Sequence, residues 1–236
     1  MNLSSGYALV TGGAGFIGGR LAGALLARGV RVRVLDVCRP EAGGPLAREA
    51  VDVILGDVAE PDTWTRALVG IDAVFHLAAA VGADTDARRY LDVNAVGTAE
   101  LFRALERGPA RVRKVVVASS LGVYGEGDYR CEQDGVQHPE LRPLAQLERH
   151  EWEPRCPTCG RPLAWTATGE RSATAPVSAY AISKYAGEQL ALSLGDAGKL
   201  GALGFAPAVS LQDGLDRFAS WIRSAGPALE PTSPVR

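Results

Sequence analysis

The sequence contains little of what marks secreted, membrane or nucleic-acid-binding proteins. Its 236 residues include four cysteines, too few for a disulfide framework in a chain of this size. The formal net charge of −2 gives no electrostatic attraction to nucleic acid or to an anionic membrane. The start, MNLSSGYALV, lacks the basic and apolar regions of a signal peptide, and no apolar run approaches the ~18 residues of a membrane span. We therefore expect a cytoplasmic protein without nucleic-acid or membrane partners.

Glycine, by contrast, is concentrated between residues 7 and 36, which have the pattern of one strand-turn-helix-strand unit. Residues 7–11 are a short apolar run with β-branched side chains, and a helix follows to about Arg28. The second strand, residues 30–35, alternates apolar with basic side chains and ends at Asp36. Four glycines punctuate the entry to the helix: Gly12, Gly13, Gly15 and Gly18.

This unit predicts a dinucleotide site. Glycines at the turn let a pyrophosphate approach the backbone, and the anion then lies on the unpaired N–H groups and positive dipole end of the helix. Asp36 can accept both hydroxyls of an adenosine ribose and would repel a 2′-phosphate, which favours NAD over NADP, although the nearby Arg39 weakens this inference. The alternative, a glycine-rich turn without a ligand, is disfavoured because strand, turn, helix, strand and acid occur in the required order.

Strands and helices continue to alternate beyond this unit. Further strands are predicted at residues 51–55, 72–77 and 114–118, with helices at 60–69 and 86–107. Because such alternation builds parallel sheets with right-handed crossovers, the expected fold is α/β: a doubly wound, Rossmann-type parallel sheet of strand order 3-2-1-4-5 with helices on both faces. The ligand crevice would lie at the C-terminal ends of strands one and four.

Several polar or small residues follow these strands. Asp57 and Val58 follow the third strand and could hold an adenine, with a solvent-facing turn as an equal alternative. The small residues 78–82 would let a cofactor pass close to the backbone, whereas His76 is interpreted as a packed strand residue rather than a catalytic base. Asn94 lies on the apolar side of its helix, where a buried amide must be hydrogen-bonded, so it is expected to hold a neighbouring cofactor loop.

Tyr180 and Lys184 are four residues apart and share a face of the next predicted helix, for which Ser178 is a plausible N-cap. A lysine ammonium beside a tyrosine stabilises the phenolate, so that Tyr180 could act as a base near neutral pH. The alternative is an amphipathic helix with an incidental Tyr/Lys pair.

Taken together, these residues resemble the extended short-chain dehydrogenase/reductases, specifically the NAD-dependent nucleotide-sugar epimerase/dehydratase family. The motifs that carry the resemblance are TGGAGFIG (11–18), Asp36, GDV (56–58), HLAA (76–79), Asn94, SSLGVYG (119–125) and YAISK (180–184).

The resemblance implies roles for individual residues. Tyr180 would be the acid/base, Lys184 would hold the nicotinamide ribose and tune Tyr180, and Ser120 would hydrogen-bond the sugar hydroxyl. Phe16 and Ile17 would lie over the pyrophosphate. The full set expected to bind NAD is Gly12, Gly15, Phe16, Ile17, Gly18, Asp36, Asp57, Val58, Leu77, Ala78, Ala79, Asn94, Tyr180 and Lys184.

The resemblance covers residues 7–194 and resumes at 199–221, so the chain is similar to a shortened family member without most of the substrate lobe. The first interpretation is an NAD-dependent 4-epimerase of a UDP- or dTDP-sugar, working through a 4-keto-sugar. The alternative is a homologue that binds NAD or a nucleotide sugar without turnover, as a binding or partner subunit. A dehydratase fits less well, because Leu121 and Gly122 stand where that chemistry in the family uses an acid pair.

The segment from residue 126 to 175 is longer than the corresponding family loop and contains a zinc-knuckle pattern. Cys156 and Cys159 are spaced as metal ligands, and Cys131 begins a related pattern. These thiolates with His138, or with Asp134 as the alternative, would form a structural zinc site, His150 being a weaker candidate. A redox C-x-x-C pair or free thiols are the other interpretations. Cys38 is expected to be a small packed residue.

The expected organisation is therefore one NAD-binding Rossmann domain, residues 1–225, with the insertion at 126–175 and a disordered tail at 226–236. By analogy with the family, a homodimer could form through the helices at 86–107 and 180–194.

Overall fold

A computed structural model of the chain describes residues 6–41, 46, 51–82, 85–108 and 112–196. Most of the loop around residues 39–50, the segment 199–221 and the predicted tail 226–236 lie outside the described residues.

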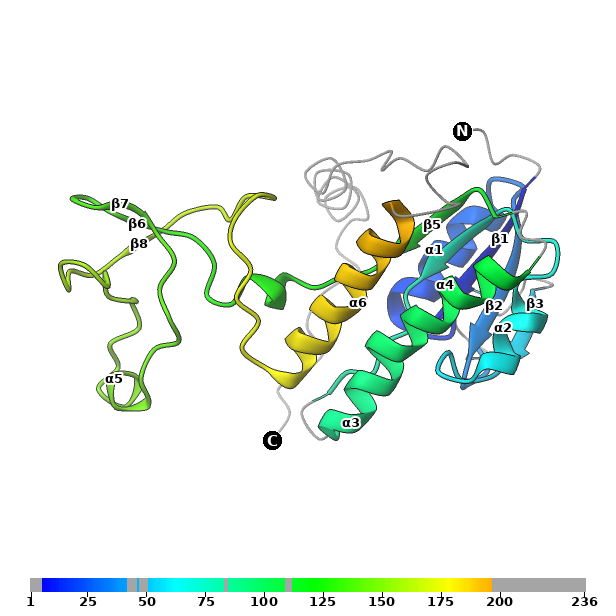
Figure 1. The fold of residues 1–236 in the computed structure, drawn as a ribbon, viewed down its shortest axis with the longest axis horizontal. Coiled ribbons are helices and arrows are strands. Elements are labelled where there is room, and N and C mark those ends of the chain that lie inside the picture. Colours follow the sequence, from blue (N-terminus) through cyan, green and yellow to red (C-terminus); the bar gives the residue numbers. More distant parts are fainter. Residues whose placement is uncertain (1–5, 42–45, 47–50, 83–84, 109–111, 197–236) are drawn as a thin grey trace. The chain divides into compact units, whose positions relative to one another are not determined.

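The described sheet has the predicted topology. Its five strands, all parallel, lie in the order β3-β2-β1-β4-β5, which confirms the order inferred from the sequence (Figure 1). Thr11 pairs with Leu35 on one side and with His76 on the other, so the C-terminal ends of three strands are level. The strands are β1 (Tyr7–Thr11), β2 (Arg31–Asp36), β3 (Asp52–Leu55), β4 (Ala73–His76) and β5 (Lys114–Val117).

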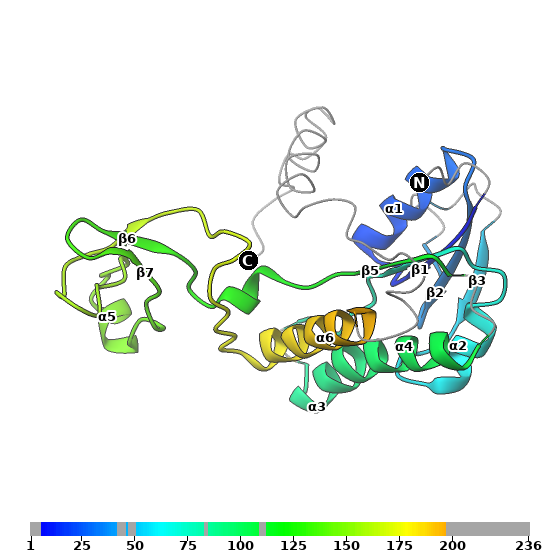
Figure 2. The same ribbon diagram turned by 45° about the horizontal axis from the view of Figure 1, so that its top comes forward.

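Helices cover both faces of this sheet, as expected. Figure 2 shows α1 on one face and α2, α4 and α6 on the other. Each face has its own buried cluster: Val10 and Val34 pack with Ala22 of α1, whereas Leu9 and Val74 lie in the cluster of α2 and α4. The helices are α1 (Phe16–Leu26), α2 (Pro61–Ala67), α3 (Ala87–Tyr90), the π-helical η1 (Leu91–Val96), α4 (Gly97–Arg107) and α6 (Ala179–Asp196).

The long helix predicted at residues 86–107 is not α-helical throughout. Its middle, η1, is a π-helix between α3 and α4, which the sequence pattern did not indicate. π-helical turns often occur at functional sites, because they displace side chains from the regular helical faces. Here η1 carries Asn94, and α6 packs against it so closely that a Cβ on Gly187 would lie 2.6 Å from the Asn94 carbonyl oxygen.

Ser178 caps α6 as the sequence suggested. Its hydroxyl accepts a hydrogen bond from the Ala181 N–H at 3.1 Å, satisfying one of the free donors in the first turn. The cap therefore fixes where the helix carrying Tyr180 begins. Among the described residues, no helix combines the length and the apolar character needed to cross a bilayer.

The inserted segment folds as a small antiparallel unit, whereas the sequence indicated only its two cysteine loops. Three strands pair in the order β7-β6-β8. The two ends of the insertion are joined at its base, where the Ala175 N–H donates to the Val123 carbonyl at 2.9 Å. The elements are η2 (Leu121–Tyr124), β6 (Tyr129–Cys131), β7 (Gly135–Gln137), α5 (Leu144–Glu148) and β8 (Ala164–Trp165).

Candidate functional site

A cleft of about 410 Å³ lies at the C-terminal ends of β1, β2 and β4, where the sequence placed a ligand crevice. Its volume is within the range of small-molecule sites. Eight predicted residues line it: Gly12, Gly15, Asp36, Asp57, Val58, Leu77, Ala78 and Ala79. Its other lining residues were not predicted as site residues: Ala14, Leu35, Val37, Cys38, Gly56, Ala80, Arg89 and Val93.

The backbone leaves no room for a side chain at Gly12, in the turn between β1 and α1, or at Gly18, in the first turn of α1. Gly12 has a φ of +70°, and a Cβ there would lie 2.8 Å from the Ala78 backbone nitrogen. A Cβ on Gly18 would lie 2.1 Å from the Gly12 carbonyl oxygen. Bare backbone at the N-terminus of α1 therefore faces the cleft, which is what a pyrophosphate requires.

Thr11, to which the sequence assigned no separate role, fixes the backbone on the opposite side of the cleft. Its hydroxyl oxygen accepts from the N–H groups of Leu77 (3.1 Å) and Ala78 (3.0 Å) and lies 2.9 Å from His76 Nδ1. His76 is buried, and burial, with a smaller contribution from Lys184, lowers its pKa to about 3. The neutral ring is a packed residue, in agreement with the sequence interpretation.

Asp36 is held in place by backbone donors on both sides. Its carboxylate accepts from the Ala14 N–H at 2.9 Å and the Cys38 N–H at 3.1 Å. One hydrogen bond comes from the glycine turn and the other from the residues after β2, so the acid is fixed between them. Cys38 is exposed and lines the cleft, which corrects the expectation that it is a packed residue.

Phe16 and Ile17 do not line this cleft. Both side chains are 67% exposed, at the first turn of α1. Phe16 instead lines a separate hollow beside the glycine turn, where the Arg20 guanidinium lies 4.6 Å from the centre of its ring. Any contact of these two side chains with a pyrophosphate stays a prediction.

Asp57 has a partner that the sequence did not reveal. Arg89 of α3 reaches it with an N–O distance of 2.7 Å, and the Ala59 N–H donates to its other oxygen at 2.9 Å. Arg89 is 32 positions further along the chain in a polar helical segment, so no local pattern identifies it. The pair brings a cation and a carboxylate to the rim of the cleft.

Asn94 connects the cleft to α6. Its amide oxygen accepts from the Ala80 N–H at 2.8 Å, and its amide nitrogen donates to the Ala80 carbonyl at 3.2 Å and to the Ser183 hydroxyl at 3.0 Å. Ser183 in turn donates to the Tyr180 carbonyl at 2.7 Å. The expected link to a neighbouring loop is thus present, and it extends to the helix of Tyr180 and Lys184.

Lys184 is buried one turn after Tyr180, with 7% of its surface exposed. Burial lowers the pKa of its ammonium group, because the charged form loses hydration. Within the described part of the chain no carboxylate forms an ion pair with it. The rings of Tyr180 and Tyr90 pack edge to face, with their centroids 5.7 Å apart. The Tyr90 hydroxyl in turn donates a hydrogen bond to the Gly82 carbonyl.

The hydroxyl groups of the two serines after β5 make different hydrogen bonds. Ser119 donates its hydroxyl hydrogen to the Glu188 carboxylate at 2.5 Å. Ser120 instead accepts from the Gly122 N–H at 3.1 Å, which leaves its own hydroxyl hydrogen free for a ligand. A Cβ on Gly122 would lie 3.4 Å from the Ala181 methyl group, so this turn contacts the first turn of α6.

The cysteines of the insertion form a second candidate site. The ligand atoms of Cys131, Asp134, Cys156 and Cys159 all lie within 4.8 Å of one another. His138 is not in this group; its Nδ1 atom lies 3.0 Å from an Asp128 carboxylate oxygen. Of the two residues that the sequence offered as fourth ligand, Asp134 thus lies beside the cysteines, and which of them binds a metal stays a prediction. His150 lies next to Trp152, with ring centroids 5.6 Å apart.

Comparison with known proteins gives consistent matches. The model of the NAD dependent epimerase/dehydratase family matches residues 8–146. The dTDP-L-rhamnose 4-epimerase of Burkholderia thailandensis is 33% identical over 192 residues, covering 77% of this chain and 52% of that protein.

Two solved structures are similar as well. The UDP-glucuronic acid 4-epimerase of Bacillus cereus, in complex with NAD, is 25% identical with a TM-score of 0.58 over 81% of this chain and 53% of that one. MoeE5, in complex with UDP-glucose and NAD, is 30% identical with a TM-score of 0.55 over 82% and 50%. The chain thus spans about half the length of each of these relatives.

Proposed function

The chain belongs to the NAD dependent epimerase/dehydratase family, and we propose that it binds NAD in the cleft and catalyses 4-epimerisation of a UDP- or dTDP-sugar. The observation that carries the proposal is the placement of Lys184. A buried cation without a carboxylate partner is costly unless a polar ligand compensates it. This cation lies on the helix that Asn94 joins to the wall of the cleft.

The residues at the cleft fit NAD. The glycine turn offers bare backbone N–H groups to a pyrophosphate, and Asp36 offers carboxylate oxygens to the ribose next to it. When bound, NAD supplies the acceptor and then the donor of a hydride. Proton transfer and binding of the sugar are assigned to the protein's own side chains.

In the proposed mechanism Tyr180 acts as the base and takes the proton from the 4-hydroxyl of the sugar, whose carbon would be oxidised by bound NAD. The Lys184 ammonium stabilises the phenolate and binds ribose hydroxyls. Ser120 donates its free hydroxyl hydrogen to the sugar oxygen. Once the 4-keto-sugar has rotated so that its opposite face would meet the reduced cofactor, Tyr180 returns the proton to the sugar oxygen.

A second candidate function is binding of NAD or a nucleotide sugar without turnover, as a partner subunit. It is favoured by length, since the chain spans about half of its relatives and a reactive keto-sugar must be kept from water. A screen of UDP- and dTDP-hexoses with NAD, followed by chromatography of the sugars, separates the two. Interconversion of any 4-epimer pair would exclude the binding-only function, and NAD binding without interconversion would exclude catalysis by this chain alone.

Replacing Ser120 with Ala should lower kcat by about 10- to 100-fold, because the substrate oxygen loses a hydrogen bond that strengthens as charge develops on it. Ser119→Ala is the matched control, since its hydroxyl is already engaged by Glu188. The rates of the two variants should be compared at saturating sugar. A larger loss for Ser119→Ala would contradict the assignment of Ser120.

Replacing Asp36 with Ala should weaken NAD binding by about 10- to 100-fold, because hydrogen bonds from the ribose hydroxyls to a carboxylate are lost. Titration calorimetry with NAD and NADP measures the effect. Asp62→Ala, in the first turn of α2, is the control. Unchanged NAD affinity in the Asp36 variant would mean that the ribose is not held at the end of β2.

A further inference from the structure

The two loops that bring the cysteines of the insertion together are built alike. One reads Cys131-Glu-Gln-Asp134-Gly135 and the other Cys156-Pro-Thr-Cys159-Gly160. Both glycines are in the left-handed region, with φ of +73° and +72°, and a Cβ on either would meet nothing within 4 Å. Glycine is therefore needed for the backbone conformation, not for space. Each loop presents its first and fourth side chains toward the other.

We propose that Cys131, Asp134, Cys156 and Cys159 bind one Zn²⁺ ion, which holds the insertion folded and takes no part in the hydride chemistry. Three thiolates and a carboxylate are a ligand set that zinc accepts, and soft sulfur ligands favour it over magnesium or calcium. Because the protein supplies all four ligands, no position stays open for a substrate, which is the mark of a structural site.

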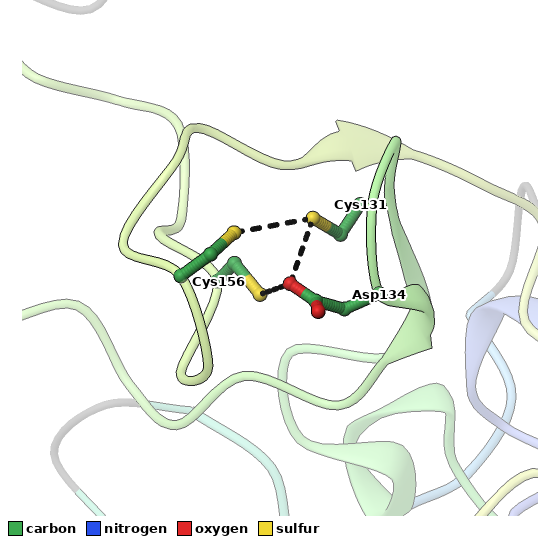
Figure 3. A group of neighbouring side chains, drawn as sticks. Cys131, Asp134 and Cys156 are labelled. Atoms are coloured by element: carbon green, nitrogen blue, oxygen red, sulfur yellow. Dashed lines mark hydrogen bonds between the residues drawn. The ribbon is translucent and has the colours of Figure 1, made fainter.

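The distances suit a tetrahedral ion. At a Zn–S distance of about 2.3 Å the edges of a tetrahedron are about 3.8 Å. Cys131 and Cys159 have their sulfur atoms 3.5 Å apart, and an Asp134 oxygen lies 3.3 Å from Cys131 Sγ and 3.2 Å from Cys156 Sγ. Figure 3 shows Cys131 and Cys156 with their sulfur atoms directed at the Asp134 carboxylate. Small shifts of these side chains would centre an ion among them.

Backbone N–H groups of the second loop also contact its two sulfur atoms. The backbone N–H groups of Cys159 and Thr158 donate to the Cys156 thiol, and the Arg161 N–H donates to the Cys159 thiol. A disulfide would instead need a sulfur separation near 2.05 Å. All three cysteines of the group are free thiols in the structure.

The apolar core of the insertion is small. Its buried cluster consists of Cys131, Cys156 and Leu163, with Tyr129 partly buried against it. So small a core buries too little apolar surface to fold a segment of this length, and small units of this kind are commonly completed by a metal. Two of the four proposed ligands, Cys131 and Cys156, also belong to this core, so removing the ion would loosen the centre of the unit.

The test is metal analysis of the full chain purified under reducing conditions. We expect one zinc per chain by mass spectrometry, and after exchange with Co²⁺ the visible bands of a tetrahedral ion with thiolate charge transfer. Asp134→Ala should weaken zinc binding by more than the 10- to 100-fold that loss of an outer-shell partner costs. His138→Ala is the matched control and should retain the ion, since it pairs with Asp128.

A second measurement keeps the proposal testable if cysteine variants do not fold. Chelation of zinc from the wild-type chain should speed proteolysis within residues 126–175, and added zinc should reverse this, with little change in NAD affinity. Purified protein without metal, a Cys131–Cys159 disulfide detected by mass, or loss of zinc in His138→Ala but not Asp134→Ala would each overturn the proposal.

Discussion

Replacing Tyr180 with Phe should lower the turnover of a nucleotide sugar by about 10²- to 10⁴-fold while NAD still binds. The substitution removes the one atom that moves the proton and keeps the ring, which Tyr90 supports at a centroid distance of 5.7 Å. Lys184 and the hydrogen bonds of Asn94 are untouched, so the cleft should keep its shape. The loss should therefore appear in kcat rather than in the affinity for NAD.

The measurement is single-turnover chemistry on the best sugar from the substrate screen, beside calorimetric titration of NAD. Tyr185→Phe provides the control, because it removes the same hydroxyl group from a tyrosine of the same helix to which the mechanism assigns no role. Equal turnover in Tyr180→Phe and wild type would refute the role of Tyr180 as acid/base. A fall of NAD affinity parallel to kcat would point to a damaged cleft instead.

Replacing Trp64 with Ala should destabilise the domain by about 3–5 kcal/mol, a large share of the 5–15 kcal/mol typical of folded domains. Trp64 is completely buried in the cluster between the sheet and the helices α2 and α4, so its removal leaves a cavity. Its indole N–H also donates to the Val58 carbonyl at 2.8 Å, and that acceptor would lose its partner. Because Val58 lines the cleft, NAD affinity should fall as well.

Urea denaturation followed by circular dichroism measures this loss. Trp152→Ala is the matched control, since that side chain is 57% exposed in the insertion and its removal creates no cavity in the Rossmann core. Similar midpoints for the two variants would mean that the cluster around Trp64 is not the main stabilising core.

The strands of the sheet, their order and the glycine turn could be read from the sequence, because each depends on local patterns. Alternating strands and helices limit the topology to a few parallel sheets, and the crevice must then lie where the strand order reverses. Together with the motifs of the family resemblance, this allowed eight residues of the cleft to be named in advance, from Gly12 to Ala79. The cap at Ser178 is local in the same sense.

Contacts between distant segments could not be read in this way. No pattern links Arg89 to Asp57, or Thr11 to the backbone of Leu77, because these pairs meet only after the strands are assembled. The close packing of α6 on the π-helical turn at Asn94 is another such contact.

The insertion likewise has features that follow from the local sequence and others that depend on the fold. The spacing of the cysteines and the glycines that follow them is enough to predict two cysteine loops. Which further side chain lies beside the thiols depends on the three-dimensional fold. Asp134 lies in the hairpin turn between β6 and β7, next to the thiols, whereas His138 lies just beyond β7 and pairs with Asp128. Spacing along the chain fixes which residues are near in sequence, but the direction of each side chain depends on strand pairing: the β6–β7 hairpin turns Asp134 toward the thiols and leaves His138 beyond its end.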